Sequence, residues 1–349
     1  DGSDIKIQGN TQAQAALRFN IFHLSSCAYD KDQTVSIGAK GLHGEGYKGH
    51  VFWDTETFML PFFIYTQPEV ARALLMYRYN TLDGARRNAF MNGFSGAQYA
   101  WESADDGLET TPKWGYDYNN KPVRIWTGDI EVHISSDIVF SIFEYYRATE
   151  DKDFMFKYGS EIIFEVCRFW TGRTVYNKDK DLWEIKSVIG PDEFHEHVDN
   201  NFYTNYLVKW TFSKALELRQ KMKDECPWEL NRIENYLCLT EKDYAAWKRI
   251  SDKILINKQQ GTDIIEQFEG YFDLKDYEIT SADENGMPQW PTGLDLSELN
   301  ATKLIKQPDV IMLMLMMPQE FSEKELKANY EYYEKRTMHK SSLSPSMYS

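Results

Sequence analysis

Apolar residues recur at three- and four-residue spacings along most of the chain, and this period predicts helices. The expected helices cover residues 10–28, 69–79, 82–94, 131–148, 154–174, 201–222, 241–256, 304–317 and 322–336. A brief strand is expected over residues 183–188, residues 114–127 are expected to form a loop or a short strand, and residues 261–290 show no regular period. The pattern therefore predicts an all-α protein.

The segments between the predicted helices are rich in glycine, aromatic and acidic residues, and none is a long Pro/Ser/Gly linker. No unit repeats at a fixed period, which argues against an array of short helical repeats. Successive helices whose connecting loops carry the functional residues are typical of an (α/α)6 barrel, a closed ring of helical hairpins with its loops gathered at one mouth. We expect a single domain over residues 1–349.

The stretch 190–205 (GPDEFHEHVDNNFYTN) combines acidic residues, histidines and aromatic rings at the start of a predicted helix. Asp199 or Asn200 is expected to be the helix N-cap. Beside rings that limit hydration, a carboxyl can keep its proton near neutral pH and act as a general acid, and Glu193 is the candidate. The alternative is that these carboxylates only complement the helix dipole and that His195 and His197 lie in a solvated loop.

Trp53 and Asp54 follow a loop that holds four glycines within residues 40–50. An indole can stack on a hexose ring while a carboxylate binds the hydroxyl groups, so this pair is a candidate sugar contact. The alternative is that Trp53 belongs to the core and Asp54 caps a helix that begins at Thr55. Farther along, Glu102 is expected to be either a sugar contact or a solvated loop carboxylate.

Charge and composition exclude several classes of partner. The net charge of -15 opposes nucleic acids and anionic membranes, because both require a basic face. No apolar run approaches the roughly 18 residues of a membrane span. Cys27, Cys167, Cys226 and Cys238 lack metal-binding or redox spacing, which is typical of buried thiols in a reducing compartment and predicts a cytoplasmic location. A Cys226–Cys238 disulfide remains open from sequence.

Four motifs occur in a fixed order: residues 41–56 (GLHGEGYKGHVFWDTE), 190–205, 306–310 (KQPDV) and 339–344 (HKSSLS). Together they resemble the motifs of the glycoside hydrolase family 65 disaccharide phosphorylases, a family of maltose, kojibiose, nigerose and trehalose phosphorylases. The resemblance extends over residues 5–349. It implies an (α/α)6-barrel catalytic domain, and it implies an N-terminal β-sandwich and a small C-terminal β-domain that we expect to be absent from this sequence.

The resemblance also implies roles for individual residues, with Glu193 as the single general acid. The implied glucosyl-binding residues are Trp53, Asp54, Lys306 and Gln307, and the implied phosphate-binding residues are His339, Ser341 and Ser342. No metal and no organic cofactor are implied, inorganic phosphate is a co-substrate, and the expected assembly is a homodimer. Two positions depart from the family pattern, since Pro308 replaces a small residue and Tyr348 stands where a histidine is frequent.

The chemistry of the last motif favours phosphate over water as the nucleophile. Phosphate needs hydroxyl, imidazolium and N–H donors, and a carboxylate would repel it. Residues 339–346 contain hydroxyl and basic groups and no Asp or Glu. An inverting hydrolase would instead need a second carboxylate to activate water.

We therefore expect reversible, inverting phosphorolysis of an α-linked glucobiose that yields β-glucose 1-phosphate and glucose. One alternative is an inverting α-glucoside hydrolase on the same barrel. The other is a non-catalytic carbohydrate-binding toroid.

Overall fold

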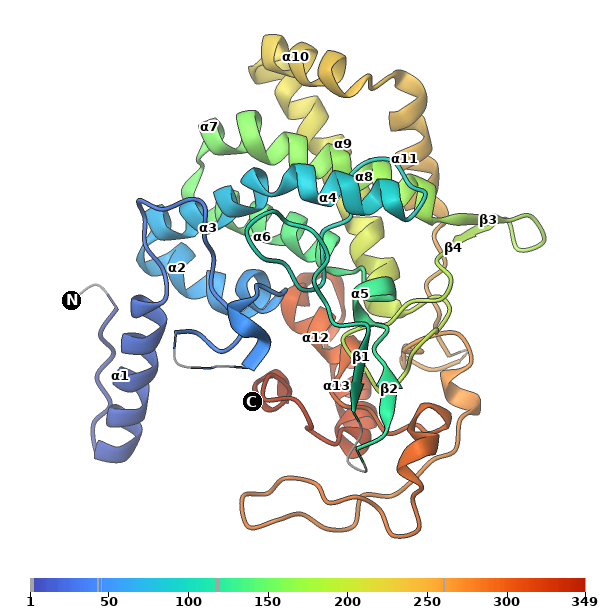
Figure 1. Cartoon of the computed structure of the whole chain (residues 1–349). Helices are drawn as coiled ribbons and strands as arrows, with labels where there is room; N and C mark the ends of the chain where they lie inside the picture. The colour runs from blue at the N-terminus through green and yellow to red at the C-terminus, as the bar shows by residue number, and fades with distance from the viewer. Residues whose placement is uncertain (1–2, 43, 45, 117–119, 260, 349) are drawn as a thin grey trace. The chain divides into compact units, whose positions relative to one another are not determined.

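The computed structural model describes residues 3–42, 44, 46–116, 120–259 and 261–348, and helices predominate among them (Figure 1). The α-helices are α1 (Thr11–Ser26), α2 (Leu60–Thr66), α3 (Pro68–Asn80), α4 (Leu82–Met91), α5 (Thr127–Ile130), α6 (Ile134–Thr149), α7 (Lys152–Phe154), α8 (Ser160–Arg173), α9 (Phe202–Glu225), α10 (Pro227–Leu237), α11 (Glu241–Lys253), α12 (Asp309–Met316) and α13 (Glu323–Tyr333). Two π-helical turns, η2 (Thr55–Met59) and η3 (Met155–Gly159), lead into α2 and α8.

Regular strands are few and short. β1 (Trp114–Tyr116) pairs antiparallel with β2 (Pro122–Arg124), and β3 (Val175–Asn177) pairs antiparallel with β4 (Leu182–Glu184). The 3₁₀ turns are η1 (Gly46–Gly49), η4 (Tyr271–Asp273), η5 (Leu296–Ala301), η6 (Pro318–Glu320), η7 (Glu334–Arg336) and η8 (Pro345–Tyr348). Within the described residues, no helix is both long enough and apolar enough to cross a membrane.

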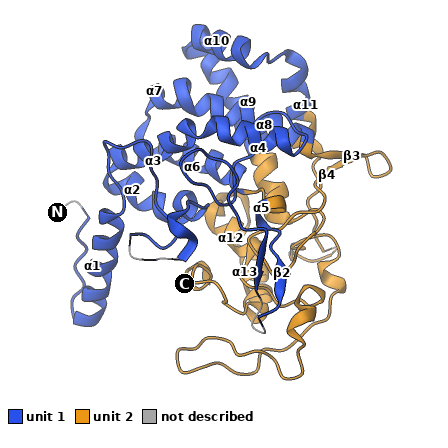
Figure 2. Ribbon diagram, viewed as in Figure 1, with its two compact units in different colours: residues 1–128, 134–172, 211–248 blue, residues 129–133, 173–210, 249–349 orange. Residues whose placement is uncertain are grey.

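The chain divides into two compact units, which Figure 2 distinguishes by colour. Unit 1 consists of residues 1–128, 134–172 and 211–248, and unit 2 consists of residues 129–133, 173–210 and 249–349. Both units are discontinuous in sequence, so the core of each is assembled from distant segments of the chain.

Unit 1 is centred on α3, which packs against α2, α4 and α6. Pro68 lies in the first turn of α3, where its missing N–H breaks no helical hydrogen bond. The helix also buries Arg78, whose side chain is 1% exposed. The Arg78 guanidinium donates to both carboxylate oxygens of Glu56 at 2.6 and 2.8 Å and to the Phe52 carbonyl at 3.0 Å, so the buried charge is compensated.

In unit 2, α12 packs against α13. Ser322 starts α13 with a capping box, in which its hydroxyl accepts from the Glu325 N–H and the Glu325 carboxylate accepts from the Ser322 N–H. Before α12 the chain is extended. Ile305 donates to the Arg336 carbonyl at 3.0 Å and accepts from the Met338 N–H at 2.8 Å, which binds the end of α13 to the segment before α12.

Most predicted helices are confirmed, but two helices begin later than predicted and one helix was not predicted. The helix predicted over residues 131–148 begins at Ile134, because the chain before it forms the separate short helix α5, whose last residue, Ile130, accepts a hydrogen bond from the Ile189 N–H. The helix predicted over residues 304–317, with residues 306–309 at or just before its start, begins at Asp309, so that start is confirmed and Leu304 and Ile305 lie outside the helix. A proline disfavours the α region for the residue before it, and Pro308 itself is extended. The helix α10 was not predicted.

The cap predicted for the long helix α9 is also corrected. The Asn201 side-chain oxygen, and not Asp199 or Asn200, accepts from the Thr204 N–H at 3.0 Å. Asp199 instead accepts from the Ser187 N–H at 2.9 Å, and Asn200 has a left-handed backbone with φ of 52°. All four cysteines are free thiols, so the disulfide left open between Cys226 and Cys238 is absent; only Cys167 is buried and Cys238 is exposed.

We expect Glu56→Ala to lower the free energy of unfolding by about 3–5 kcal/mol, because Arg78 would keep a buried charge without its carboxylate. Urea unfolding followed by circular dichroism measures the change. The matched control is Asp83→Ala, because Asp83 also pairs with an arginine, Arg86, at 2.8 Å but its side chain is 89% exposed. Its loss should stay below about 1 kcal/mol, and equal losses in the two variants would contradict the prediction.

Candidate active site

The loop that carries Glu193 is closed at its base by an antiparallel bridge. Val188 and Val198 exchange two backbone hydrogen bonds of 2.9 Å, and Ile189 donates to Ile130 at 3.1 Å. At Gly190 the backbone passes so close to its neighbours that an added Cβ would lie 2.3 Å from Asp309 Oδ2. These contacts fix the point from which residues 191–197 emerge.

The buried carboxylate of Asp192 joins this loop to the segment before α12. Its Oδ1 accepts from the Lys306 N–H at 2.7 Å and from the Phe194 N–H at 3.2 Å. Its Oδ2 accepts from Gln267 Nε2 at 2.9 Å and lies 2.6 Å from His195 Nδ1. Asp192 therefore positions the backbone on both sides of Glu193 and at Lys306.

A second buried carboxyl, Asp309, supports the same loop from the first turn of α12. Its Oδ1 accepts from the Asp192 N–H at 2.6 Å and its Oδ2 accepts from Asn201 Nδ2 at 2.7 Å. Burial and the neighbouring Asp192 carboxylate raise the pKa of Asp309 to about 7. Asp309 is thus partly protonated near neutral pH, which limits the repulsion between the two carboxyls.

His195 is 2% exposed, so the sequence-based alternative of a solvated histidine is wrong for this residue. Its ring packs against Phe268 and Tyr271, with centroid distances of 4.9 and 6.1 Å. Its Nε2 donates to the Thr302 carbonyl at 2.7 Å. Burial alone would lower the pKa of His195, but the charge and hydrogen bond of Asp192 outweigh burial and leave that pKa raised.

Glu193 and Lys306, 113 residues apart in sequence, form an ion pair in which Lys306 Nζ donates to Glu193 Oε1 at 2.7 Å. The Glu193 side chain is 34% exposed and that of Lys306 is 23% exposed, so the pair can be reached from solvent. Gln307, the adjacent sugar-binding candidate, is buried, and its amide donates to the Pro191 carbonyl. The structure therefore brings three of the predicted site residues together in unit 2.

The segment predicted to bind phosphate, residues 339–344, is hydrogen-bonded to the backbone of Lys306. Lys340 donates its N–H to the Lys306 carbonyl at 3.2 Å, so residues 339–341 begin beside Lys306. His339 has a left-handed backbone, with φ of 47°, and its Nδ1 lies 2.9 Å from Ser344 Oγ. Burial lowers the pKa of His339, which disfavours the imidazolium form expected from sequence.

The two hydroxyls predicted to bind phosphate differ in exposure. Ser341 is half-buried and its Oγ accepts from the Leu343 N–H at 3.3 Å, whereas Ser342 is exposed. Tyr348, the residue that departs from the family pattern, donates or accepts at the Thr337 hydroxyl at 2.7 Å, and its ring contacts His339 edge-to-face at 5.5 Å. The tyrosine thus supports the turn that carries the segment.

Trp53 and Asp54 belong to unit 1. Trp53 is 2% exposed and packs against Phe58 and Trp101, as a core residue does, and its role toward a sugar stays a prediction. Asp54 makes no side-chain capping hydrogen bond at the start of η2, so the capping alternative is wrong. Glu102 is buried and lies 2.6 Å from His50 Nδ1, which excludes the solvated alternative.

Sequence reasoning missed one buried acid near this loop, Glu131. Its carboxyl is 1% exposed, neither oxygen has a hydrogen-bond partner among the described residues, and His133 Nε2 lies 3.5 Å from its Oε1. Burial raises the pKa of Glu131 well above the ordinary value, and the charge of Glu193 adds to the rise. The available signal was a polar pair at residues 131 and 133 inside a segment predicted to be an apolar helix.

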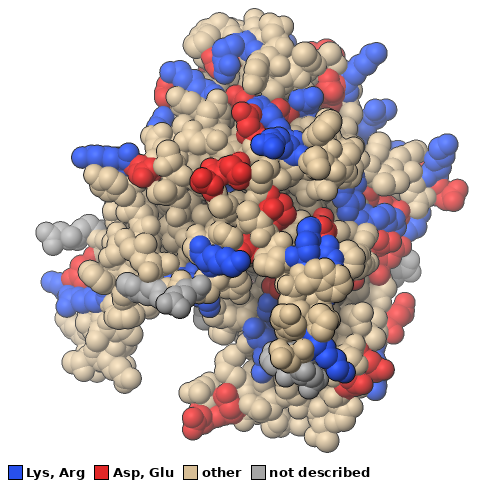
Figure 3. All heavy atoms as spheres, in the orientation of Figure 1, with Lys and Arg blue, Asp and Glu red and all other residues tan. Residues whose placement is uncertain are grey.

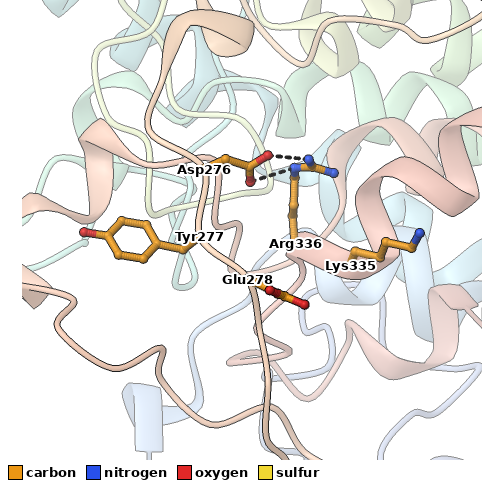
Figure 4. A pocket seen from close by; sticks show the side chains of 5 residues that line it. All are labelled: Asp276, Tyr277, Glu278, Lys335 and Arg336. Atoms are coloured by element: carbon orange, nitrogen blue, oxygen red, sulfur yellow. Dashed lines mark hydrogen bonds and ion pairs between the residues drawn. The ribbon is translucent and has the colours of Figure 1, made fainter.

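Away from the loop, unit 2 has a pocket lined by five residues, shown in Figure 4: Asp276, Tyr277, Glu278, Lys335 and Arg336. Arg336 is already neutralised there by Asp276, so the pocket presents no spare arginine to an anion. On the face drawn in Figure 3, basic and acidic side chains are interspersed rather than gathered by sign. Among the described residues, no cluster of three or more His, Cys, Asp or Glu could hold a metal ion.

The chain belongs to glycosyl hydrolase family 65: residues 18–349 match the family's central catalytic domain. This confirms the resemblance inferred from the four motifs.

Several curated relatives match almost the whole chain. It is 60% identical over 346 residues to a kojibiose phosphorylase of Thermoanaerobacter brockii, covering 99% of this chain and 45% of the relative. A kojibiose phosphorylase of Halothermothrix orenii is 48% identical over 347 residues, with 99% and 44% covered. An alpha,alpha-trehalose phosphorylase of Thermoanaerobacter brockii is 40% identical over 350 residues, with 99% and 43% covered. The chain thus spans under half the length of these relatives.

A solved structure has the same fold. It is a protein from the human microbiome that is provisionally named a kojibiose phosphorylase, and it is 35% identical to this chain with a TM-score of 0.86. The match covers 99% of this chain and 44% of that chain.

We expect Gly190→Ala to lower the free energy of unfolding by about 1–3 kcal/mol, because the added methyl would overlap Asp309 and the Asn201 amide, 2.3 and 2.4 Å away. Thermal unfolding measures the loss. The control is Gly172→Ala in α8, where the added Cβ would meet only a Phe94 ring carbon at 3.3 Å. That change should shift the free energy by less than about 1 kcal/mol, since alanine favours a helix. An unaffected Gly190→Ala protein would show that the loop base can relax.

Proposed function

We propose that this chain is the catalytic domain of an inverting disaccharide phosphorylase that cleaves kojibiose with inorganic phosphate and yields β-glucose 1-phosphate and glucose. Its family membership and its 60% and 48% identity to two kojibiose phosphorylases support this substrate. The single observation that carries the chemistry is the cluster of Glu193, Lys306 and the segment that starts at His339, joined by the Glu193–Lys306 ion pair and the Lys340–Lys306 backbone hydrogen bond.

The proposal includes the architecture and setting that the family implies. The helices would close into an (α/α)6 barrel, and residues 1–349 would act as one catalytic domain. The reaction would use no metal and no organic cofactor, because phosphate itself supplies the attacking oxygen. The protein would act in the cytoplasm as a homodimer, which light scattering on the purified protein tests directly.

In this reaction Glu193 would protonate the glycosidic oxygen as the bond to the leaving glucose breaks. Proton donation requires a neutral carboxyl, whereas the ion pair with the Lys306 ammonium stabilises the anionic form of Glu193. We therefore assign Lys306 a movement: when the disaccharide enters, its Nζ would leave Glu193 and bind hydroxyl groups of the glucosyl unit. Without this counter-charge the Glu193 carboxylate would take up a proton from solvent, and it would then deliver that proton to the glycosidic oxygen. Trp53, Asp54 and Gln307 would hold the same unit.

Phosphate would attack from the opposite side of the sugar ring, which inverts the anomeric centre. Ser341 and Ser342 would donate their hydroxyls, and His339 would donate a ring N–H. Phosphate carries its own negative charge, so no carboxylate base is needed to activate it. Residues 339–346 contain no Asp or Glu that would repel the anion.

The hydrolase alternative requires a second carboxylate that can accept a proton from water. Glu131 interacts electrostatically with Glu193 and Lys306, which makes it a candidate for that role. Burial raises the pKa of Glu131 well above the ordinary value, which disfavours the anionic form that a base requires. The environment of Glu131 thus favours phosphorolysis over hydrolysis.

A panel of α-glucobioses tests the reaction. With inorganic phosphate we expect β-glucose 1-phosphate from kojibiose, less from trehalose and nigerose, no product without phosphate, and no effect of EDTA.

Glu193→Gln should reduce kcat by at least about 10³-fold while retaining sugar binding by calorimetry, because an amide has no proton to deliver. The control is Glu217→Gln, at a side chain of α9 that is 62% exposed, and its kcat should be unchanged. Glucose release without phosphate, or an active Glu193→Gln variant, would refute the mechanism.

Glu131→Gln separates the phosphorylase from the hydrolase. A glutamine keeps the size and neutrality of the protonated carboxyl but cannot act as a base. We therefore expect the variant to keep phosphorolysis within about tenfold of the wild-type kcat. A loss of 10³-fold or more, with thermal stability unchanged, would assign Glu131 the role of a base and favour the hydrolase.

A further inference from the structure

The hydrogen bonds around Asp192 and His195 determine where the protons lie in this buried pair. The Thr302 carbonyl can only accept, so His195 Nε2 carries a proton. On the other side, Asp192 Oδ1 accepts two backbone N–H groups, from Phe194 and Lys306, and Oδ2 accepts from the Gln267 amide. Three donated hydrogen bonds stabilise the carboxylate form of Asp192, which favours placing the hydrogen of the 2.6 Å contact on His195 Nδ1.

With both ring nitrogens protonated, His195 is an imidazolium ion inside the protein. The charged and titratable groups that face it are Asp192 in its own loop and Asp309 at the start of α12, while Tyr271 faces it as a neutral phenol that donates to the Lys303 carbonyl at 2.7 Å. Two acidic groups thus share one cation. The raised pKa of His195 agrees with this assignment.

We propose that His195 is a positioning residue: its buried positive charge keeps Asp192 anionic, and anionic Asp192 holds the backbone of Lys306 and of the Glu193 loop at the spacing that the reaction requires. His195 acts through Asp192, because its Nδ1 lies 2.6 Å from the Asp192 carboxylate that holds the Lys306 N–H. The kinetic consequences rest on the proposed function, whereas the charge state of His195 does not.

Loss of the His195 proton would leave two buried acids without a counter-charge. Asp192 would then have to take up a proton or move toward water, and either change weakens its bond to the Lys306 N–H. Because the pKa of folded His195 is raised above its unfolded value, the stabilisation is present at low pH and is lost as pH rises through the folded-state value. Catalysis should therefore decline on the alkaline side as His195 titrates.

Nitrogen-15 NMR of histidine-labelled wild-type protein tests the charge directly. His195→Gln identifies the resonances by their disappearance, and His197→Gln, at an exposed position in the same loop, is the control. We expect both His195 ring nitrogens to show imidazolium shifts at pH 7.5 and to titrate only at higher pH. Neutral-imidazole shifts at pH 7.5 would overturn the proposal, whether or not the protein is a phosphorylase.

Kinetics test the positioning role with a double-mutant cycle. We expect His195→Gln to reduce kcat by about 10²-fold and to abolish the alkaline decline that parallels the NMR titration, while His197→Gln changes neither. In an Asp192→Asn background, where no anion needs compensation, His195→Gln should cost less than about threefold. Equal losses in both backgrounds, in variants that melt as folded proteins, would show a merely structural role. An active Glu193→Gln variant would instead refute the proposed reaction and leave the NMR result standing.

Discussion

One buried anion organises the candidate site. The Asp192 carboxylate takes four hydrogen bonds, from Phe194, Lys306, Gln267 and His195, which come from three separate stretches of the chain. Burying a carboxylate is costly unless each lone pair is satisfied and a counter-charge is present, and here both conditions are met. The Glu193 loop, the segment before α12 and the segment after α11 must therefore adopt these positions together.

This constraint explains why the adjacent glycine, proline and amide residues occupy their places. Gly190 lets the loop pass against Asp309, and Pro308 ends the extended segment so that α12 starts at Asp309. Asp309 in turn holds the Asp192 N–H. Buried groups thus hold the backbone on both sides of the partly exposed Glu193–Lys306 ion pair. A site that aligns a proton donor requires such rigid support.

Unit 1 also contains a buried charge that is compensated, but by different groups. Arg78, buried in α3, is neutralised by the Glu56 carboxylate. It also donates to the carbonyl of Phe52, the residue directly before Trp53 and Asp54. The partly buried His50–Glu102 pair lies in the same unit. Trp53 and Asp54 in unit 1, and Glu193 in unit 2, thus each lie within a few residues of a buried charged pair that holds the local backbone.

Apolar periodicity and short motifs determined the helix-rich fold, the family and the identity of Glu193, Lys306 and the 339–344 segment as candidates, because these depend on residues close together in sequence. Only the tertiary structure decided that Glu193 contacts Lys306, that His195 is buried against Asp192, that Asn201 caps α9, and that α12 begins at Asp309. The reason is that the burial and protonation of a polar group depend on partners that lie as many as 117 residues away, as Asp309 does from Asp192. No local pattern encodes such a partner.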